Sequence, residues 1–310
     1  VFLTKVGLLF SGQGAQVPGM GKDFYDKIPV FAETIDQASE ICGFDLTECF
    51  GSSEMLKQTK YVQPALCAFS YGVFKALKNA APDLNVVGGI GLSLGEYPAL
   101  IASSMLDFET GMKLVSKRAE FMQEDCDRHQ SSMAAILKPD VELVEKICAE
   151  ISTDEKPVSI ANYNSPKQVV IGGGDEAVKK ASEKLSEEGK MRVVELNVNG
   201  AFHTPLFRTS SQRLGEVLKA VSFKDPEFVI ESNTDKIPFT KENAAEILQR
   251  QVMSPTHFAA CVEKMIKDCE IETFVEIGPG ETLSKFVRQI DRNVGRASVE
   301  TLEKMQKFSL

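Results

Sequence analysis

Two patterns of apolar and polar positions recur along this chain. Short apolar runs bounded by glycine or polar residues are typical of buried parallel strands, and apolar residues three or four positions apart are typical of amphipathic helices. The strand pattern occurs at residues 5–10, 86–91, 228–233 and 273–277. The helix pattern occurs at 29–42, 63–80, 107–126, 205–219, 243–251 and 258–267, and again after Gly278-Pro279-Gly280, over 283–290. Strands that alternate with helices predict an α/β fold built on a parallel sheet.

A different order of elements occupies residues 132–198. Strands are predicted at 133–137, 158–162, 168–172 and 191–198, and helices at 141–151 and 176–188. This β-α-β-β-α-β order is that of the ferredoxin-like unit, and its length suits a self-contained subdomain. Within it, Gly172-Gly173-Gly174 lacks the lysine and the spacing of a phosphate-binding loop. We therefore expect a strand-to-helix turn there, capped by Asp175.

Composition narrows the class of protein. The 310 residues are 43% apolar, enough for a substantial core, and the net charge of −9 argues against general affinity for nucleic acid or anionic membranes. No apolar run could span a bilayer and no secretory signal is recognised, so a cytoplasmic protein is expected. The seven cysteines show no paired spacing and are expected as reduced core residues. With three histidines, a metal site is not expected.

The most informative stretch is Gly91-Leu92-Ser93-Leu94-Gly95. An apolar run precedes it, and Pro98 fits the first turn of a helix that follows, so the local order is strand, sharp turn, helix. This is the context of a nucleophile elbow, in which a strained serine lies at the start of a helix. The alternative is a glycine-rich turn that contains a serine by chance.

Two further residues, Gln13 and His203, are candidates for catalytic roles together with Ser93. Gln13 lies between two glycines after the first strand, where it could direct an amide N–H at an oxyanion, although an ordinary loop would look the same. His203 lies just before Thr204 and Pro205, which predict a helix start with Thr204 as cap, at a crossing between the two units. It is the best candidate for a base, with His257 second, but it could be purely structural.

Arg118 lies on the apolar side of its predicted helix, near Leu114, Val115 and Phe121. We expect it to be at least partly buried, and a buried guanidinium requires an anion. That anion could be an acidic residue of the protein or the carboxylate of a ligand. The residues alone leave both alternatives open.

Taken together, several motifs in order resemble malonyl-CoA:acyl carrier protein transacylases over essentially the whole chain. They are Gly12-Gln13-Gly14-Ala15-Gln16, Gly91-Leu92-Ser93-Leu94-Gly95-Glu96, Arg118 before Phe121-Met122-Gln123, Asn162-Tyr163-Asn164-Ser165-Pro166, Gly200-Ala201-Phe202-His203 and Glu276-Ile277-Gly278-Pro279-Gly280.

The resemblance implies a fold and a reaction. The fold is a hydrolase-like α/β domain of residues 1–129 and 199–310, with the ferredoxin-like unit, residues 130–198, inserted in it. The reaction is a ping-pong transfer of malonyl from malonyl-CoA, through a malonyl-serine, to the phosphopantetheine thiol of acyl carrier protein, supplying fatty acid elongation in a bacterial type II system. No cofactor of the protein itself, no nucleic acid and no membrane partner is expected, and the protein is expected to be a monomer.

The resemblance also implies residue roles. Ser93 matches the nucleophile, His203 the base, Arg118 the group that binds the malonyl carboxylate, and Gln13 with the backbone N–H of Leu94 the oxyanion hole; the main-chain carbonyl of Gln251 matches the group that orients the histidine. Phe202, Leu92 and Asn162 fall at substrate-binding positions. Leu92 stands where the family commonly has histidine, so a polar contact near the acyl group is missing, and Phe202 resembles the malonyl-selective form of its motif.

Two other functions compete with transfer. A serine esterase or thioesterase would use the same elbow, but it would have no use for an arginine that binds a carboxylate. A catalytically silent docking module would not need Ser93, His203, Arg118 and Gln13 together. For the acidic carrier protein we expect a local basic surface, either Lys190 with Arg192 or the group Lys285, Arg288 and Arg292.

Overall fold

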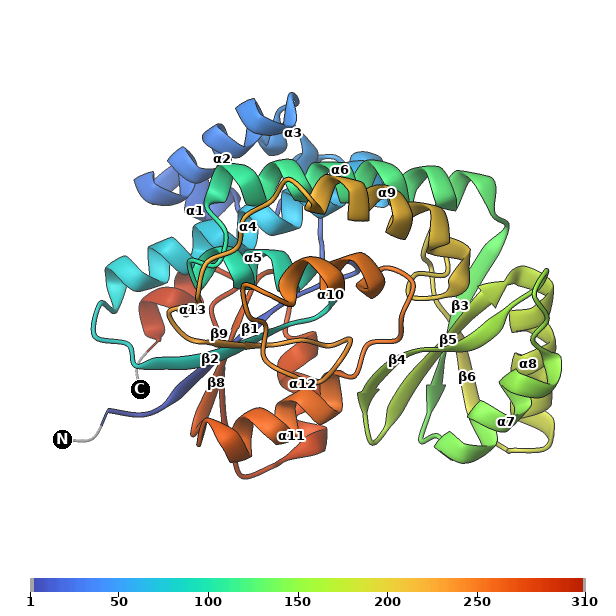
Figure 1. Ribbon diagram of the computed structural model, residues 1–310. Helices are drawn as coiled ribbons and strands as arrows, with labels where there is room; N and C mark the ends of the chain where they lie inside the picture. Colours follow the sequence, from blue (N-terminus) through green and yellow to red (C-terminus); the bar gives the residue numbers. More distant parts are fainter. Residues whose placement is uncertain (1–2, 309–310) are drawn as a thin grey trace.

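The computed structural model describes residues 3–308 and is built on two sheets (Figure 1). The larger sheet has five parallel strands in the order β7-β2-β1-β8-β9. Their bounds are β1 Val6–Phe10, β2 Val86–Gly91, β7 Val229–Glu231, β8 Thr273–Ile277 and β9 Gly295–Ser298. The central strand β1 is buried along its whole length, as its continuous apolar sequence predicts.

Helices pack on both faces of this sheet. One face is covered by a large apolar core to which α2, α4, α5 and α6 contribute, and the other by a smaller core from α11 and α12. The helices of this part are α1 Lys22–Lys27, α2 Pro29–Cys42, α3 Leu46–Gly51, α4 Thr59–Ala80, α5 Glu96–Ala102, α6 Phe108–Arg128, α9 Arg208–Leu218, α10 Ala244–Gln251, α11 Phe258–Asp268, α12 Thr282–Ile290 and α13 Leu302–Lys307. The predicted α/β class with a parallel sheet is confirmed.

The smaller sheet is antiparallel and has the order β4-β5-β3-β6. Its elements are β3 Ser131–Leu137, α7 Val141–Ile151, β4 Val158–Ser165, β5 Gln168–Gly174, α8 Asp175–Glu187 and β6 Arg192–Glu195. Both helices pack on one face through a separate apolar cluster, and Figure 1 shows them on the outer side of the molecule. The predicted β-α-β-β-α-β order of elements is the one observed, whereas the exact division of the chain at residues 130 and 198 stays a prediction.

Of two predicted helix caps, Asp175 is wrong and Thr204 is in the predicted position without a side-chain cap hydrogen bond. Strand β5 continues through Gly174, which takes the cap position of α8, so Asp175 is the first residue of the helix. The backbone N–H of Gly174 donates to the carbonyl oxygen of Pro157 at 3.0 Å, which continues the pairing to this residue. A Cβ at Gly173 would lie 2.0 Å from the same oxygen, so only glycine permits this approach. Thr204 is at the predicted N-cap position, before a 3-10 turn, Pro205–Phe207, that leads directly into α9, but its hydroxyl donates to the carbonyl of Ala201 and makes no cap hydrogen bond.

Other boundaries differ from the predicted ones. Helix α4 begins at Thr59 and continues through Pro64, which removes one backbone hydrogen bond without ending the helix. The strands β6 and β7 are shorter than predicted, and α1, α3, β9 and α13 were not predicted. In residues 3–308 no helix combines the length and the apolar character needed to cross a bilayer.

Candidate active site

Ser93 lies at a sharp turn between β2 and α5. The turn needs glycine on both sides, since a Cβ at Gly91 would lie 2.0 Å from the carbonyl carbon of Gly95, and a Cβ at Gly95 would lie 2.1 Å from the carbonyl oxygen of Phe10. Ser93 has φ 54°, in the left-handed region that non-glycine residues rarely adopt. The predicted strand, turn and helix are therefore all present, with the serine in a strained conformation.

His203 contacts Ser93 directly. Its Nε2 lies 2.7 Å from Oγ of Ser93, and its Nδ1 lies 2.8 Å from the carbonyl oxygen of Gln251 and 3.1 Å from that of Ser254. Carbonyl oxygens only accept hydrogen bonds, so Nδ1 carries the proton and Nε2 is free to accept from the serine hydroxyl. His203 also has a positive φ, 65°, and its backbone N–H donates to the carbonyl of Val252.

Burial keeps the His203 imidazole neutral. The side chain is buried, which lowers its pKa to about 4; the two carbonyl acceptors oppose this shift and the charge of Arg118 adds to it. A neutral imidazole at neutral pH is the form that can take a proton from Ser93. His257, the second candidate, lies elsewhere, stacked on Tyr163 with ring centroids 4.8 Å apart.

Arg118 is 1% exposed and lies beside the serine. Its Nη2 donates to Oγ of Ser93 at 3.2 Å and to Oε1 of Gln251 at 2.9 Å, and its Nη1 donates to Oε1 of Gln63 at 2.6 Å. In residues 3–308 no acidic side chain lies within ion-pair distance of it, and its Nε has no hydrogen-bond partner. Of the two alternatives left open by the sequence, a direct salt bridge within the protein is therefore wrong.

Gln13 and the backbone N–H of Leu94, the groups expected to form the oxyanion hole, line the same cavity as Ser93. The side chain of Gln13 is engaged elsewhere, because its Nε2 donates to Oγ1 of Thr59 at 3.3 Å and its Oε1 accepts from Gln63 at 3.3 Å. Among the described residues, the backbone N–H groups of Gln13 and Leu94 donate to no protein acceptor. Backbone donors of this kind can bind a developing negative charge, and Leu94 lies in the turn that leads into α5.

A cavity of about 400 Å³ opens over this group of residues. Ser93, His203, Arg118, Gln13 and Leu94 all line it, and so do the other predicted substrate-binding positions, Leu92, Asn162 and Phe202. Asn162 is held by a hydrogen bond from its Nδ2 to Thr256, and Phe202 packs against Phe207. The cavity lies between the two sheets, since β4, β5 and the chain after β6 also contribute to its wall.

Sequence reasoning missed four residues that touch this group: Gln63, Asn233, Ser254 and Glu96. Asn233 accepts the backbone N–H of Ser93 at 3.1 Å, and Glu96 accepts the backbone N–H of Asn233 at 2.6 Å. Glu96 follows directly on the elbow, and an acidic residue in the first turn of a buried helix is the one signal that could have marked it. No local sequence pattern marks Gln63, Asn233 or Ser254 as residues of the site.

Comparisons of the sequence and of the structure with known proteins all find acyl transferases. Residues 8–307 match the family model described as "Acyl transferase domain". A malonyl CoA-acyl carrier protein transacylase of Bacillus subtilis is 36% identical over 97% of this chain and 96% of its own length. The crystal structure of MCAT from Streptococcus pneumoniae superposes with a TM-score of 0.92 at 41% identity, covering 98% of this chain and all of that one. A type II PKS acyl-carrier protein in complex with its malonyl-transacylase gives 0.93 at 30% identity, with 98% of both chains covered.

Proposed function

This chain belongs to the malonyl-CoA:acyl carrier protein transacylases of the acyl transferase family, and from that membership we propose that it transfers malonyl from malonyl-CoA to the phosphopantetheine thiol of an acyl carrier protein. One observation carries the proposal. The Nη2 atom of Arg118 lies 3.2 Å from Oγ of Ser93. The carboxylate of a malonyl group is one methylene away from the carbonyl that Ser93 attacks, so the same arginine can bind it.

The first half-reaction forms the malonyl ester. Nε2 of His203 takes the proton as Oγ of Ser93 attacks the thioester carbonyl, and the negative charge on that oxygen is bound by the backbone N–H groups of Gln13 and Leu94. The C–S bond then breaks, and the coenzyme A thiolate leaves with the proton from His203. The carbonyls of Gln251 and Ser254 hold the imidazole in the required tautomer, in the position that a carboxylate has in many serine enzymes.

The second half-reaction is the reverse with a different thiol. His203 accepts the proton of the phosphopantetheine thiol, the sulfur attacks the malonyl ester, and Ser93 recovers its proton as it leaves. The phosphopantetheine is carried by the acyl carrier protein, and no cofactor of the enzyme itself takes part. Such a reaction belongs in the cytoplasm, and we propose a monomer there.

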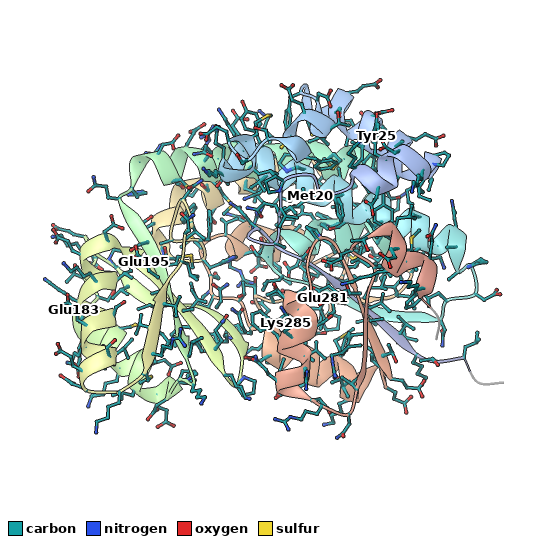
Figure 2. The ribbon with its side chains drawn as sticks, turned by 180° about the vertical axis from the view of Figure 1, so that it is seen from behind. Met20, Tyr25, Glu183, Glu195, Glu281 and Lys285 are labelled. Atoms are coloured by element: carbon teal, nitrogen blue, oxygen red, sulfur yellow. The ribbon has the colours of Figure 1, made fainter. Side chains whose placement is uncertain are left out.

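The acyl carrier protein must dock at the mouth of the cavity. Thr282, Leu283 and Phe286 of α12 line the cavity, and Lys285 and Arg288 are exposed on the same helix. Figure 2 shows Lys285 of α12, and Glu281 just before this helix, on the face of the molecule that also carries Glu195 of β6. Salt screens charges beyond about 8–10 Å, so an acidic carrier that approaches α12 is attracted by Lys285 and Arg288 more than it is repelled by the distant acidic residues of the enzyme.

Intact-mass measurement tests the proposal. After mixing with malonyl-CoA, the protein is expected to gain one malonyl group on Ser93, and holo acyl carrier protein is expected to remove it and carry it away. Lack of an adduct would contradict the proposal. An adduct that is released only as free malonate would instead identify a thioesterase.

A further inference from the structure

A buried group of polar side chains lies beneath Ser93, and the transfer chemistry described above does not use it. Its centre is Glu96, the first residue of α5, which is fully buried. One carboxyl oxygen of Glu96 accepts the backbone N–H of Asn233 at 2.6 Å, and the other accepts from Nε2 of Gln251. Both oxygens therefore face N–H donors, and neither contacts the cavity.

Gln251 joins Glu96 to the active site. Its Nε2 also donates to the carbonyl oxygen of Ser93 at 3.0 Å, while its Oε1 accepts from Nη2 of Arg118 at 2.9 Å. The two ends of an amide are not equivalent, because the nitrogen only donates and the oxygen only accepts. If the Gln251 amide turned over, its NH₂ group would face the guanidinium of Arg118 and its oxygen would face the oxygens of Glu96 and Ser93.

We infer that Glu96 is a positioning residue for substrate selection: it fixes the orientation of the Gln251 amide, and the amide oxygen in turn holds the guanidinium of Arg118 where the malonyl carboxylate binds. The inference rests on the proposed function. Burial raises the pKa of Glu96 to about 8, while its N–H donors and Arg118 lower it. The positioning is the same whether or not Glu96 is protonated, because each carboxyl oxygen keeps a lone pair that can accept an N–H group.

This arrangement also explains how Arg118 is buried without an ion pair. Its Nη atoms donate to the neutral oxygens of Gln63 and Gln251, which satisfy donors without neutralising the charge. The full positive charge thus stays available for a carboxylate that enters the cavity. The carboxyl group of Glu96 contacts Gln251 and not Arg118 itself. It therefore does not compete with the substrate carboxylate for the guanidinium.

The variant Glu96→Gln tests the inference. An amide at position 96 has one acceptor oxygen for two N–H donors, so its NH₂ group must face the N–H of Asn233 or that of Gln251, and either contact displaces the side chain that holds the Gln251 amide. We expect the KM for malonyl-CoA in Ser93 acylation to rise about tenfold or more. Acylation by acetyl-CoA, which has no carboxylate, is expected to change less than threefold, so the malonyl-to-acetyl preference falls.

Two further variants keep the test decisive. Gln251→Met removes the bridging amide but keeps the main-chain carbonyl that contacts His203, and it should lower the same preference even if Glu96→Gln fails to fold. Asp125→Asn is the matched control, because Asp125 is also buried and accepts two hydrogen bonds from Ser210, yet it contacts none of the site residues. It is expected to lower the melting temperature and to leave the preference unchanged.

The outcomes separate the inference from the function on which it rests. If the native protein forms a malonyl adduct but Glu96→Gln and Gln251→Met lower the malonyl and acetyl rates equally, Glu96 is structural and the inference is overturned. If the native protein forms no malonyl adduct, the proposed function fails and the inference fails with it. A selective loss of malonyl use in both variants, absent in Asp125→Asn, supports it.

Discussion

The guanidinium of Arg118 donates a hydrogen bond to Oγ of Ser93 at 3.2 Å, so a buried cation and the nucleophile are in contact before any substrate binds. The same Oγ lies 2.7 Å from His203. The serine hydroxyl thus accepts from the arginine and donates to the histidine. A substrate carboxylate can take over the contact with the arginine while the proton transfer to the histidine is left intact.

Removal of Arg118 should therefore change substrate choice more than reactivity. In Arg118→Ala the malonyl carboxylate loses its contact with the guanidinium, which is worth about 1–3 kcal/mol, so malonyl transfer is expected to fall ten-fold to a few hundred-fold. Acetyl transfer is expected to stay the same or to increase. Arg118→Lys should rescue poorly, because an ammonium lacks the planar fork of donors. Rates of Ser93 acylation by the two coenzyme A esters measure the preference.

Arg213→Ala is a suitable control for this prediction. Arg213, on α9, pairs with Glu124 and stacks on Phe121, and both partners lie on α6, the helix that carries Arg118. Arg213 is partly exposed and does not line the cavity. An unchanged malonyl-to-acetyl preference in Arg118→Ala, or the same change in both variants, would contradict the assignment.

Ser93→Ala should abolish the malonyl adduct. Within the described residues Ser93 is the serine at a strained strand-to-helix turn and in contact with a histidine. Intact-mass measurement after incubation with malonyl-CoA checks this, with Ser11→Ala as control, since Ser11 also lines the cavity. A malonyl adduct at full occupancy on Ser93→Ala would show that the nucleophile is another residue.

Loss of His203 should lower transfer by about 10²–10⁴, the usual contribution of a general base. The matched control is His257→Ala, because His257 is stacked on Tyr163 and lies outside the cavity. We expect the control to retain most of the activity. The reverse order of the two variants in a single-turnover assay would make His257 the base.

The acylation rate should persist to lower pH than it would with a histidine base of ordinary pKa. Because burial lowers the pKa of His203 to about 4, the neutral base persists well below the ordinary value of about 6.5. The acylation rate is expected to be level down to about pH 5 and to fall as pH approaches the lowered pKa. Half-loss of the rate near pH 6.5, with the fold intact, would contradict this environment.

The same shift predicts a pH dependence of stability. Between about pH 6.5 and 4 the unfolded chain binds a proton at His203 that the folded protein does not, so the free energy of unfolding falls as pH is lowered through this window. His203→Ala should remove that part of the dependence. Urea unfolding of both proteins at several pH values measures it.

Charge reversal on α12 should separate the two half-reactions. Lys285→Glu and Arg288→Glu are expected to weaken the use of acyl carrier protein, while the rate of malonylation by malonyl-CoA changes little. Lys190→Glu with Arg192→Glu is the comparison, because these exposed residues form the other predicted basic group. Selective loss in the comparison pair alone would place the docking surface on the smaller sheet instead.

The sequence predicts best what local patterns determine. Continuous apolar runs located β1, β2 and β8, and the glycines at 91 and 95 located the elbow, because each signal lies within about ten residues. The helices α1 and α3 are six residues long, too short for a periodic apolar face to show.

The contacts around Arg118 were beyond sequence reasoning for a different reason. Gln63, Gln251 and Glu96 come from separate helices, α4, α10 and α5, and Glu96 and Gln251 are 155 positions apart in the chain. Periodicity correctly indicates that Arg118 faces the interior, but it contains no information on which acceptors the fold brings there.

The close packing at Gly91 and Gly95 limits how this protein can be re-engineered. Any side chain at either position would overlap backbone atoms of Gly95 or Phe10, so a library that randomises these two positions should return glycine in every active clone. Leu92 and Phe202 carry no such restriction and both face the cavity. A search for new acyl substrates therefore has its useful variation at positions 92 and 202, next to a turn whose two glycines must stay as they are.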